Sequence, residues 1–239
     1  MANFNQEMGY DRTITMFSPD GRLLQVEYAK KTVEKGNDAL GFACKDGVLL
    51  ISTKKSHDKL MVLKSVEKSY VIDNHIISVS SGMLSDARVL IDRCRVVAQE
   101  NRIKFDSNLD VLSLVKNVSD LMQYYTQAGG MRPFGVSFTI GGIDSSGAKV
   151  YKTDPSGVYF EFLATSTGKN EEEINKLLVE KYDKNLLIKD AVKIGFDILK
   201  VVQKEEFDKE SLDIIYLKDE KDATPVILFG DEVNKHFGL

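Results

Sequence analysis

Residues 10–29 read YDRTITMFSPDGRLLQVEYA, and this stretch holds the most distinctive pattern of the chain. Within it, residues 18–21 (SPDG) are typical of a turn, because proline fixes φ at the second turn position and glycine is favoured at the fourth. A helix is predicted to follow over residues 22–35 and to end at Gly36. Two stripes of that helix are candidates for packing, one with Leu24, Tyr28 and Lys31 and the other with Val26, Ala29 and Val33. A helix with two such faces needs two partners.

After this helix the chain is organised in blocks of strands and pairs of helices. Runs rich in β-branched residues and bounded by turn residues predict strands, and apolar residues at helical spacing predict helices. The predicted strands are 39–44, 48–53, 67–72, 76–80, 134–142, 149–153, 158–164, 212–217 and 226–229, and the predicted helix pairs are 84–98 with 111–125 and 171–182 with 189–204. Because strands and helices do not alternate strictly, antiparallel sheets with outer helices are favoured over a parallel doubly wound sheet. We expect an α+β fold in four layers, ordered αββα, with an additional N-terminal helix.

Composition excludes several classes of function. The chain of 239 residues has a formal net charge of −4 with interleaved signs, which provides neither a basic field for nucleic acid nor an anchor for a membrane. No apolar run approaches the roughly 18 residues of a membrane-spanning helix, and residues 1–12 do not resemble a secretory signal. Cys44 and Cys94 cannot form a disulfide framework, and the three histidines lack metal-ligand spacing. We expect one cytoplasmic domain over residues 1–239, with protein partners and without metal or cofactor.

Residues 10–29 closely resemble the N-terminal signature of proteasome α subunits of the archaeal type. The resemblance continues in register through residues 39–41 (ALG), 47–50 (GVLL), 81–82 (SG), 86–88 (DAR), 132–136 (RPFGV), 141–144 (GGID) and 154–157 (DPSG). It implies the Ntn-hydrolase αββα sandwich in residues 38–239, preceded by the helix 22–35. It also implies a heptameric ring of identical α subunits, stacked on a catalytic ring of β subunits.

The catalytic β relatives of this family use a threonine at a free N-terminus, with its hydroxyl as nucleophile and its α-amine as base. By resemblance, Asn37 stands where that threonine would be, and 36 residues precede it. Thr53 stands at the acidic position that supports the active-site lysine, and Lys68 stands at the position of that lysine. Asn37 offers neither a hydroxyl nor a free amine, so the resemblance implies a non-catalytic role for this chain.

The resemblance gives Lys68 another role. With Gly36, Gly82 and Met83 as neighbours, Lys68 would lie in a pocket between adjacent subunits and pair with the C-terminal carboxylate of an AAA ATPase activator's tail. An ordinary solvated lysine at a strand end is the alternative.

The resemblance also implies a gate at the N-terminus. Tyr10, Asp11, Pro19 and Tyr28 would form a cluster that holds the N-terminal tail away from the pore, and residues 1–9 would be the mobile gate segment. An ordered N-terminal turn without a gating role is the alternative.

A third set of residues would line the path behind the gate. Ala128, Gly129 and Gly130 would lie at a narrow annulus, which unfolded substrate proteins would cross on their way to the β subunits. A simple loop is the alternative for these three residues. Residues 166–169 (STGK) are less glycine-rich than is usual in the family and receive no role.

The rival hypothesis is an enzyme, either a self-processing Ntn hydrolase or a β-type threonine peptidase. Such an enzyme would remove its own N-terminal part to expose a nucleophile. Position 37 is neither Ser, Thr nor Cys, which disfavours this hypothesis. A nucleic-acid-binding protein is disfavoured because the chain has no basic or aromatic stripe.

Overall fold

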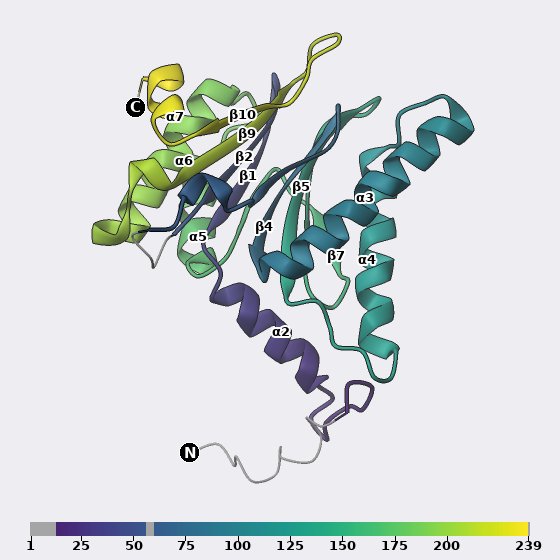
Figure 1. The fold of residues 1–239 in the computed structure, drawn as a ribbon. Coiled ribbons are helices and arrows are strands. Elements are labelled where there is room, and N and C mark those ends of the chain that lie inside the picture. The colour runs from purple at the N-terminus through teal and green to yellow at the C-terminus, as the bar shows by residue number, and fades with distance from the viewer. Residues whose placement is uncertain (1–12, 56–59, 239) are drawn as a thin grey trace.

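Two five-stranded antiparallel sheets form the centre of the computed structural model, which describes residues 13–55 and 60–238 (Figure 1). The first sheet has the strand order β10-β9-β2-β1-β8, and its strands are β1 (Ala39–Cys44), β2 (Gly47–Thr53), β8 (Ala164–Thr167), β9 (Leu212–Lys218) and β10 (Val226–Phe229). The second has the order β3-β4-β5-β6-β7, and its strands are β3 (Ser69–Asp73), β4 (Ile76–Gly82), β5 (Val136–Asp144), β6 (Gly147–Thr153) and β7 (Tyr159–Glu161).

Helices cover the outer face of each sheet. The second sheet is covered by α3 (Leu84–Phe105) and α4 (Val111–Gln127). The first sheet is covered by α5 (Glu171–Lys181), α6 (Ile188–Gln203) and the short C-terminal α7 (Asp231–Phe237). Single 3₁₀ turns lie at Leu63–Ser65, Lys204–Glu206 and Lys209–Ser211. The predicted αββα sandwich is thereby confirmed.

Strand β2 explains why two sheets stack. All of its residues are buried. Leu49 and Ile51 belong to the apolar cluster under α5 and α6, whereas Val48 and Leu50 belong to the cluster between the sheets. Successive side chains of a strand point to opposite faces, so a strand that is apolar on both faces needs helices on one side and a second sheet on the other.

Helix α2 (Leu24–Glu34) lies outside the four layers. It packs on β4 and β5 and extends away from the sandwich toward the N-terminal segment (Figure 1). The predicted second stripe is buried, since Val26, Ala29 and Val33 face the sandwich. Of the first stripe only Leu24 is buried, and Tyr28 is 41% exposed. One face of α2 therefore remains open to solvent in the isolated chain.

Two elements differ from the prediction. The prediction of a single strand over residues 158–164 is wrong, because the chain changes from the second sheet to the first within this range. The Phe162 amide still donates to Val150 O of β6 in the second sheet. The carbonyl of the next residue, Leu163, accepts from the Ala43 amide of β1 in the first sheet. Residues 164–167 then form β8 at the edge of the first sheet. Ser166 and Thr167, two of the residues for which no role was predicted, belong to this strand. Helix α7 was not predicted, because a helix of seven residues is too short to show a clear period.

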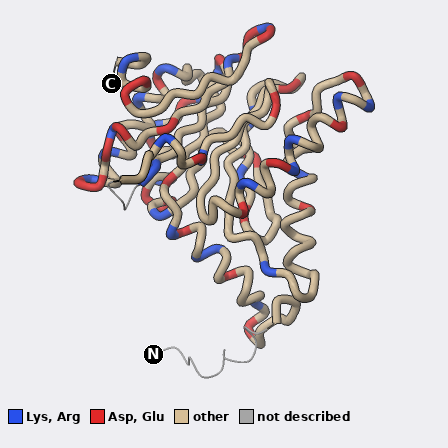
Figure 2. The backbone as a smooth tube through the Cα atoms, in the orientation of Figure 1, with Lys and Arg blue, Asp and Glu red and all other residues tan. Residues whose placement is uncertain are grey.

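Charge is distributed as expected from the sequence. Lysine and arginine alternate with aspartate and glutamate along the helices and loops of the described chain (Figure 2). Among the helices described, none is both long enough and apolar enough to cross a membrane.

Candidate functional site

The α2–β1 linker, residues 35–38, contains Asn37, the residue that by resemblance stands at the nucleophile position of catalytic relatives. The carbonyl oxygen of Asn37 accepts two hydrogen bonds, from Lys68 Nζ at 3.0 Å and from Ser81 Oγ at 3.0 Å. Lys68 Nζ also donates to the carbonyl oxygen of Thr53 at 3.0 Å. The Thr53 hydroxyl donates to Asp38 O at 3.3 Å. The structure thus brings together Asn37, Thr53 and Lys68, which the resemblance had placed at the three catalytic positions.

Lys68 is not a solvated lysine, and that alternative is wrong. The residue is only 3% exposed. Burial lowers the pKa of its amine to about 7, while Asp38 and Asp213 act to raise this pKa and Lys54 lowers it further. An ordinary lysine has a pKa near ~10.4 and stays charged at neutral pH. Lys68 is therefore divided between a charged and a neutral form close to pH 7.

The acidic neighbours of Lys68 are engaged by their own chain. Buried Asp213 pairs with Lys54 at 2.9 Å. Buried Asp38 accepts from the backbone amide and the side-chain amide of Asn170, at 2.9 and 2.8 Å, and from Gln203 Nε2 at 2.7 Å. These bonds leave Lys68 without a direct carboxylate partner among the ion pairs of the described residues.

A cavity of about 580 Å³ opens beside the linker. It is lined by Asn37, Asp38 and Thr53, and by the four lysines Lys35, Lys54, Lys55 and Lys169 among other residues. Two of these lysines, Lys55 and Lys169, both contact Glu206, at 2.8 and 3.6 Å. The cavity thus gives solvent access to the backbone that Lys68 binds.

The predicted neighbours of Lys68 surround the same linker. A Cβ atom on Gly36 would lie 2.3 Å from Ser81 Oγ and 2.5 Å from the Gly82 amide nitrogen, so only glycine fits there. Gly82 has φ +109°, a conformation that side chains rarely adopt. Met83 follows directly, and its amide donates to Gly135 O at 2.8 Å. Gly36, Gly82 and Lys68 therefore gather around Asn37, with Met83 next to them.

Only part of the predicted gate can be located. Tyr10, Asp11 and residues 1–9 lie outside the described residues. The turn over residues 18–21 is confirmed, since the Gly21 amide donates to Ser18 O at 2.8 Å. Pro19 lies in this turn and Tyr28 lies on α2, and both side chains are exposed.

The loop after α4 lies beside the N-terminal segment. Ala128 caps the helix through its amide, which donates to Tyr124 O at 3.0 Å. A cavity of about 490 Å³ is lined on one side by Gly129, Gly130, Met131 and Arg132 and on the other by Gln25 and by residues 13–15. Two segments that lie about 115 residues apart in the sequence, residues 13–15 and residues 129–132, are therefore neighbours.

A carboxylate fixes the far end of this loop. Asp86, at the start of α3, accepts two hydrogen bonds of 2.7 Å from the guanidinium of Arg132 and one of 2.9 Å from the Gly135 amide. Burial alone would raise the pKa of Asp86, but the bonds from Arg132 and Gly135 outweigh it, and the pKa is lowered. The loop from residue 128 to residue 135 is thus anchored at both ends.

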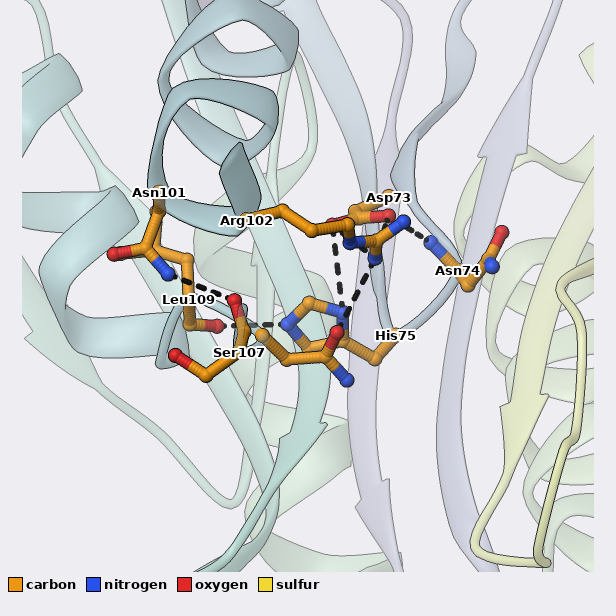
Figure 3. Close-up of polar contacts among 8 residues, drawn as sticks. Asp73, Asn74, His75, Asn101, Arg102, Ser107 and Leu109 are labelled. Atoms are coloured by element: carbon orange, nitrogen blue, oxygen red, sulfur yellow. Dashed lines mark hydrogen bonds and ion pairs between the residues drawn. The ribbon is translucent and has the colours of Figure 1, made fainter. Parts of the chain in front are cut away.

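A second polar cluster, which was not predicted, lies near the β3–β4 turn (Figure 3). The guanidinium of Arg102 on α3 binds both carboxylate oxygens of Asp73, at 2.8 and 2.9 Å, and Asn108 at 3.2 Å. His75 Nε2 donates to Leu109 O at 2.7 Å, and its Nδ1 lies 3.7 Å from Asp73. These bonds join the β3–β4 turn to the α3–α4 loop, which is a structural task.

Ser81 belongs to the site, although no role was predicted for it. It belongs to the SG motif of residues 81–82, but a serine in a β-branched strand is usually a satisfied core residue. The glycine at position 36 offered the only hint, because a helix that ends on a glycine is often packed closely against a neighbour.

Comparison with known proteins gives consistent matches. The family model for proteasome subunits matches residues 33–217, and the model for the N-terminal signature of A-type proteasome subunits matches residues 10–31. The chain is 44% identical over 212 residues to the proteasome α subunit of Archaeoglobus fulgidus, which covers 89% of this chain and 86% of the relative. It is 44% identical over 211 residues to the proteasome α subunit of Methanococcus vannielii, and the match covers 88% of this chain and 81% of that relative. It is 41% identical over 230 residues to the proteasome α subunit of Picrophilus torridus, and the match covers 96% of this chain and 97% of that relative.

Proposed function

The chain belongs to the proteasome α-subunit family, and from that premise we propose that it is a non-catalytic ring subunit that gates a proteolytic chamber and receives activator tails. Seven identical copies form the ring, β subunits supply the peptidase activity, and unfolded proteins pass through the pore. Docking of an AAA ATPase at the outer face opens the gate in the cytoplasm.

One observation carries the non-catalytic role: the residue at the nucleophile position is Asn37, within an anchored linker. Its nitrogen is part of a peptide bond, its side chain has no hydroxyl, and its carbonyl oxygen is held by Lys68 and Ser81. Nucleophilic catalysis of this type needs a hydroxyl or thiol and an adjacent base. Lys68 binds backbone carbonyls here and has no nucleophile to activate.

The packing of α2 weighs against the rival enzyme. Self-processing would have to discard everything before position 37. Val26, Ala29 and Val33 are buried against the sandwich, and burial of such side chains contributes on the order of 1–3 kcal/mol each. A segment packed in this way belongs to the folded protein. The intact mass of the purified chain tests this directly, since a product that begins near Asn37 would revive the enzyme hypothesis.

The docking role is supported by the donors of Lys68. A charged lysine has three N–H donors, and two of them are directed at Asn37 O and Thr53 O. To the third we assign the tail carboxylate. The cavity beside Asn37 and Thr53, whose carbonyls Lys68 binds, is where we place the backbone of a tail. In a ring, the neighbouring copy would close the pocket that one chain leaves open.

The gating role is supported by the neighbourhood of the N-terminal segment. Residues 13–15 share a cavity with Gly129 and Gly130, so the segment that leads to residues 1–9 lies next to the loop proposed as the annulus. Pro19, in the turn before α2, and Tyr28, on α2, are exposed, and the proposal makes them the partners of Tyr10 and Asp11, which lie outside the described residues.

The decisive experiment combines assembly and stimulation. The chain alone should form seven-fold rings in electron micrographs and show no peptidase activity. Together with β subunits it should hydrolyse a short fluorogenic peptide, and a tail peptide should stimulate this activity. Here the tail peptide is a short synthetic peptide with an aromatic side chain near a free C-terminal carboxylate. Lys68→Ala should abolish most of the stimulation, because it removes a charge-assisted hydrogen bond worth about 1.5–3 kcal/mol per pocket and several pockets act together. Full stimulation of Lys68→Ala particles would refute the docking role.

A further inference from the structure

Two lysines on the wall of the cavity beside the linker hold a carboxylate of their own chain. Lys55 lies just after β2, Lys169 lies just after β8, and Glu206 lies in the 3₁₀ turn that follows α6. One carboxylate oxygen of Glu206, Oε2, is 2.8 Å from Lys55 Nζ and 3.6 Å from Lys169 Nζ. Three segments that are far apart in the sequence therefore meet where two cations bind one anion.

Lys55 and Lys169 differ from a third lysine of the cavity, Lys54. Lys54 is buried and paired with buried Asp213 at 2.9 Å, so it is committed to the core. The side chains of Lys55 and Lys169 are 45% and 60% exposed, and both bind Glu206. A charged lysine has three N–H donors, and two cations that share one carboxylate keep an excess of positive charge. The pair is therefore suited to a carboxylate that enters the cavity from outside the chain.

The backbone after α6 positions Glu206. At Lys204, where α6 ends, φ is +49°, a conformation that is uncommon for residues other than glycine. The ring of Phe207 then packs edge-on against Phe196 of α6, with the ring centroids 5.1 Å apart. The chain is thus fixed on both sides of Glu206, whose side chain nevertheless stays 56% exposed.

The contacts of Glu206 fill the pair of lysines without closing it. The hydrogen bond from Lys55 and the charge of Lys169 lower the pKa of Glu206, so its carboxylate is ionised at neutral pH. An ion pair between exposed side chains changes an equilibrium by only about 1.5- to fivefold, because water screens the charges. A peptide that is already held in the cavity presents its own carboxylate at high effective concentration. Such a carboxylate can therefore replace Glu206.

We propose that Lys55 and Lys169 form a second anion site in the cavity, which takes an acidic side chain of the docking tail and is occupied by Glu206 when no tail is bound. The site is separate from Lys68, which is buried and binds Asn37 O and Thr53 O. It favours tails with glutamate or aspartate before the aromatic side chain and disfavours tails with lysine there, because like charges repel. The inference rests on the proposed docking function, because it concerns which tail sequences the same cavity accepts.

Three tail peptides test the selection on rings of this chain. They are identical except that the three residues before the aromatic side chain are all glutamate, all glutamine or all lysine. In fluorescence anisotropy at low salt, the glutamate peptide should bind wild-type rings about threefold more tightly than the glutamine peptide, and the lysine peptide should bind more weakly than either. The preference for glutamate should shrink as salt is added, because salt screens exposed charges.

Variants then assign the preference to named residues. Glu206→Gln removes the internal competitor, so the glutamate peptide should bind roughly threefold more tightly and the glutamine peptide should change less than about twofold. Glu205→Gln is the matched control, since it removes the same charge from the neighbouring exposed residue, which pairs with no lysine in the described part of the chain. That variant should bind all three peptides like the wild type. Replacing both Lys55 and Lys169 by glutamine should abolish the preference for glutamate and the gain from Glu206→Gln.

A second measurement needs no variant and follows the exchange of partners directly. A carbodiimide joins a carboxylate to an amine with which it is in contact, and mass spectrometry identifies the joined residues. Without peptide, Glu206 should be joined to Lys55 or Lys169. Saturating glutamate peptide should suppress this product and become joined to the same lysines, whereas the glutamine peptide should leave the product unchanged.

The results that overturn the proposal are distinct from those that overturn docking. Equal affinities of the glutamate and glutamine peptides for wild-type rings would show that the second anion site is wrong while docking stands. So would a glutamate preference that survives in the variant lacking both lysines, or a Glu206 cross-link that persists with the glutamate peptide bound. If none of the three peptides binds, the docking function itself is wrong, and the second anion site is rejected with it.

Discussion

Tail docking at Lys68 should weaken steeply as the pH rises above 7. The neutral amine of a lysine has two N–H donors and one lone pair, and the two donors are those that Asn37 O and Thr53 O already accept. A carboxylate would then face the lone pair, which repels it. Protonation replaces the lone pair by a third N–H, which can donate to the carboxylate. Docking therefore requires the charged amine, and a Lys68 that is neutral before docking must take up a proton when the tail binds.

The size of the effect follows from the lowered pKa of Lys68. Burial brings that pKa to about 7. At that value about half of the pockets are charged at pH 7, roughly a tenth at pH 8 and roughly a hundredth at pH 9. The dissociation constant of a single tail should therefore rise about 50-fold between pH 7 and pH 9, or about 2.3 kcal/mol. With an ordinary lysine pKa the change over the same range would be only a few per cent.

The assay should measure binding and not hydrolysis, because an N-terminal amine, the base that the proposed function assigns to β subunits, titrates in the same range. Fluorescence anisotropy of a labelled tail peptide on rings of this chain avoids that difficulty. A peptide with an amidated C-terminus is the matched control, since it lacks the carboxylate and should bind weakly at every pH. An affinity that is the same at pH 7 and pH 9 for the free-acid peptide would refute the reasoning, because Lys68 would then be charged throughout.

Three further predictions concern the gate, the linker and the loop after α4. Removing residues 1–9 should speed hydrolysis of a short peptide by the α/β particle without activator, because the proposed plug is gone; an unchanged rate would rule out the plug. Gly36→Ala should lower the free energy of unfolding by about 1–3 kcal/mol in urea denaturation, because the new methyl group overlaps Ser81 Oγ and the Gly82 amide; unaltered stability would contradict the tight contact. Because the pKa of Asp86 is lowered in the folded chain, its ionised carboxylate stabilises the fold at every pH above the ordinary aspartate pKa near ~4. This stabilisation is lost as the pH falls through the lowered pKa. Asp86→Asn should remove that pH dependence from acid-unfolding curves, and curves of identical shape would show that the bonds from Arg132 do not matter.

The long elements of the fold could be predicted because their sequence periods are clear. The helices of the two outer layers repeat apolar residues at helical spacing, and β2 is apolar on both faces, as a strand between two layers must be. The change of sheet between β7 and β8 could not be predicted. It takes place over Phe162 and Leu163, and neither glycine nor proline marks the position. The sequence shows residues that favour extended backbone, but it does not show which sheet each residue joins.

The residues of the site could be predicted, but the burial of Lys68 and its hydrogen bonds could not. Asn37, Thr53 and Lys68 were placed together by resemblance, because no spacing in the sequence indicates that they meet. Neither resemblance nor spacing indicated that Lys68 is buried, since a lysine between Glu67 and Ser69 has the sequence context of a surface residue. The amine of Lys68 is covered by backbone that lies far from it in the sequence, since it binds the carbonyls of Asn37 and Thr53.

The contacts of Lys68 suggest how a catalytic geometry can serve another purpose. The resemblance implies that in an active relative the lysine at this position acts with the nucleophile and the free amine of the first residue. In this chain the same position faces residue 37 as well, but the group it meets is a backbone carbonyl in the middle of the chain. The lysine of the catalytic position therefore holds the connection between the sandwich and an added helix. Since that connection leads to the N-terminal segment, the docking that we propose at this lysine would take place at the base of that segment and needs no chemistry at residue 37.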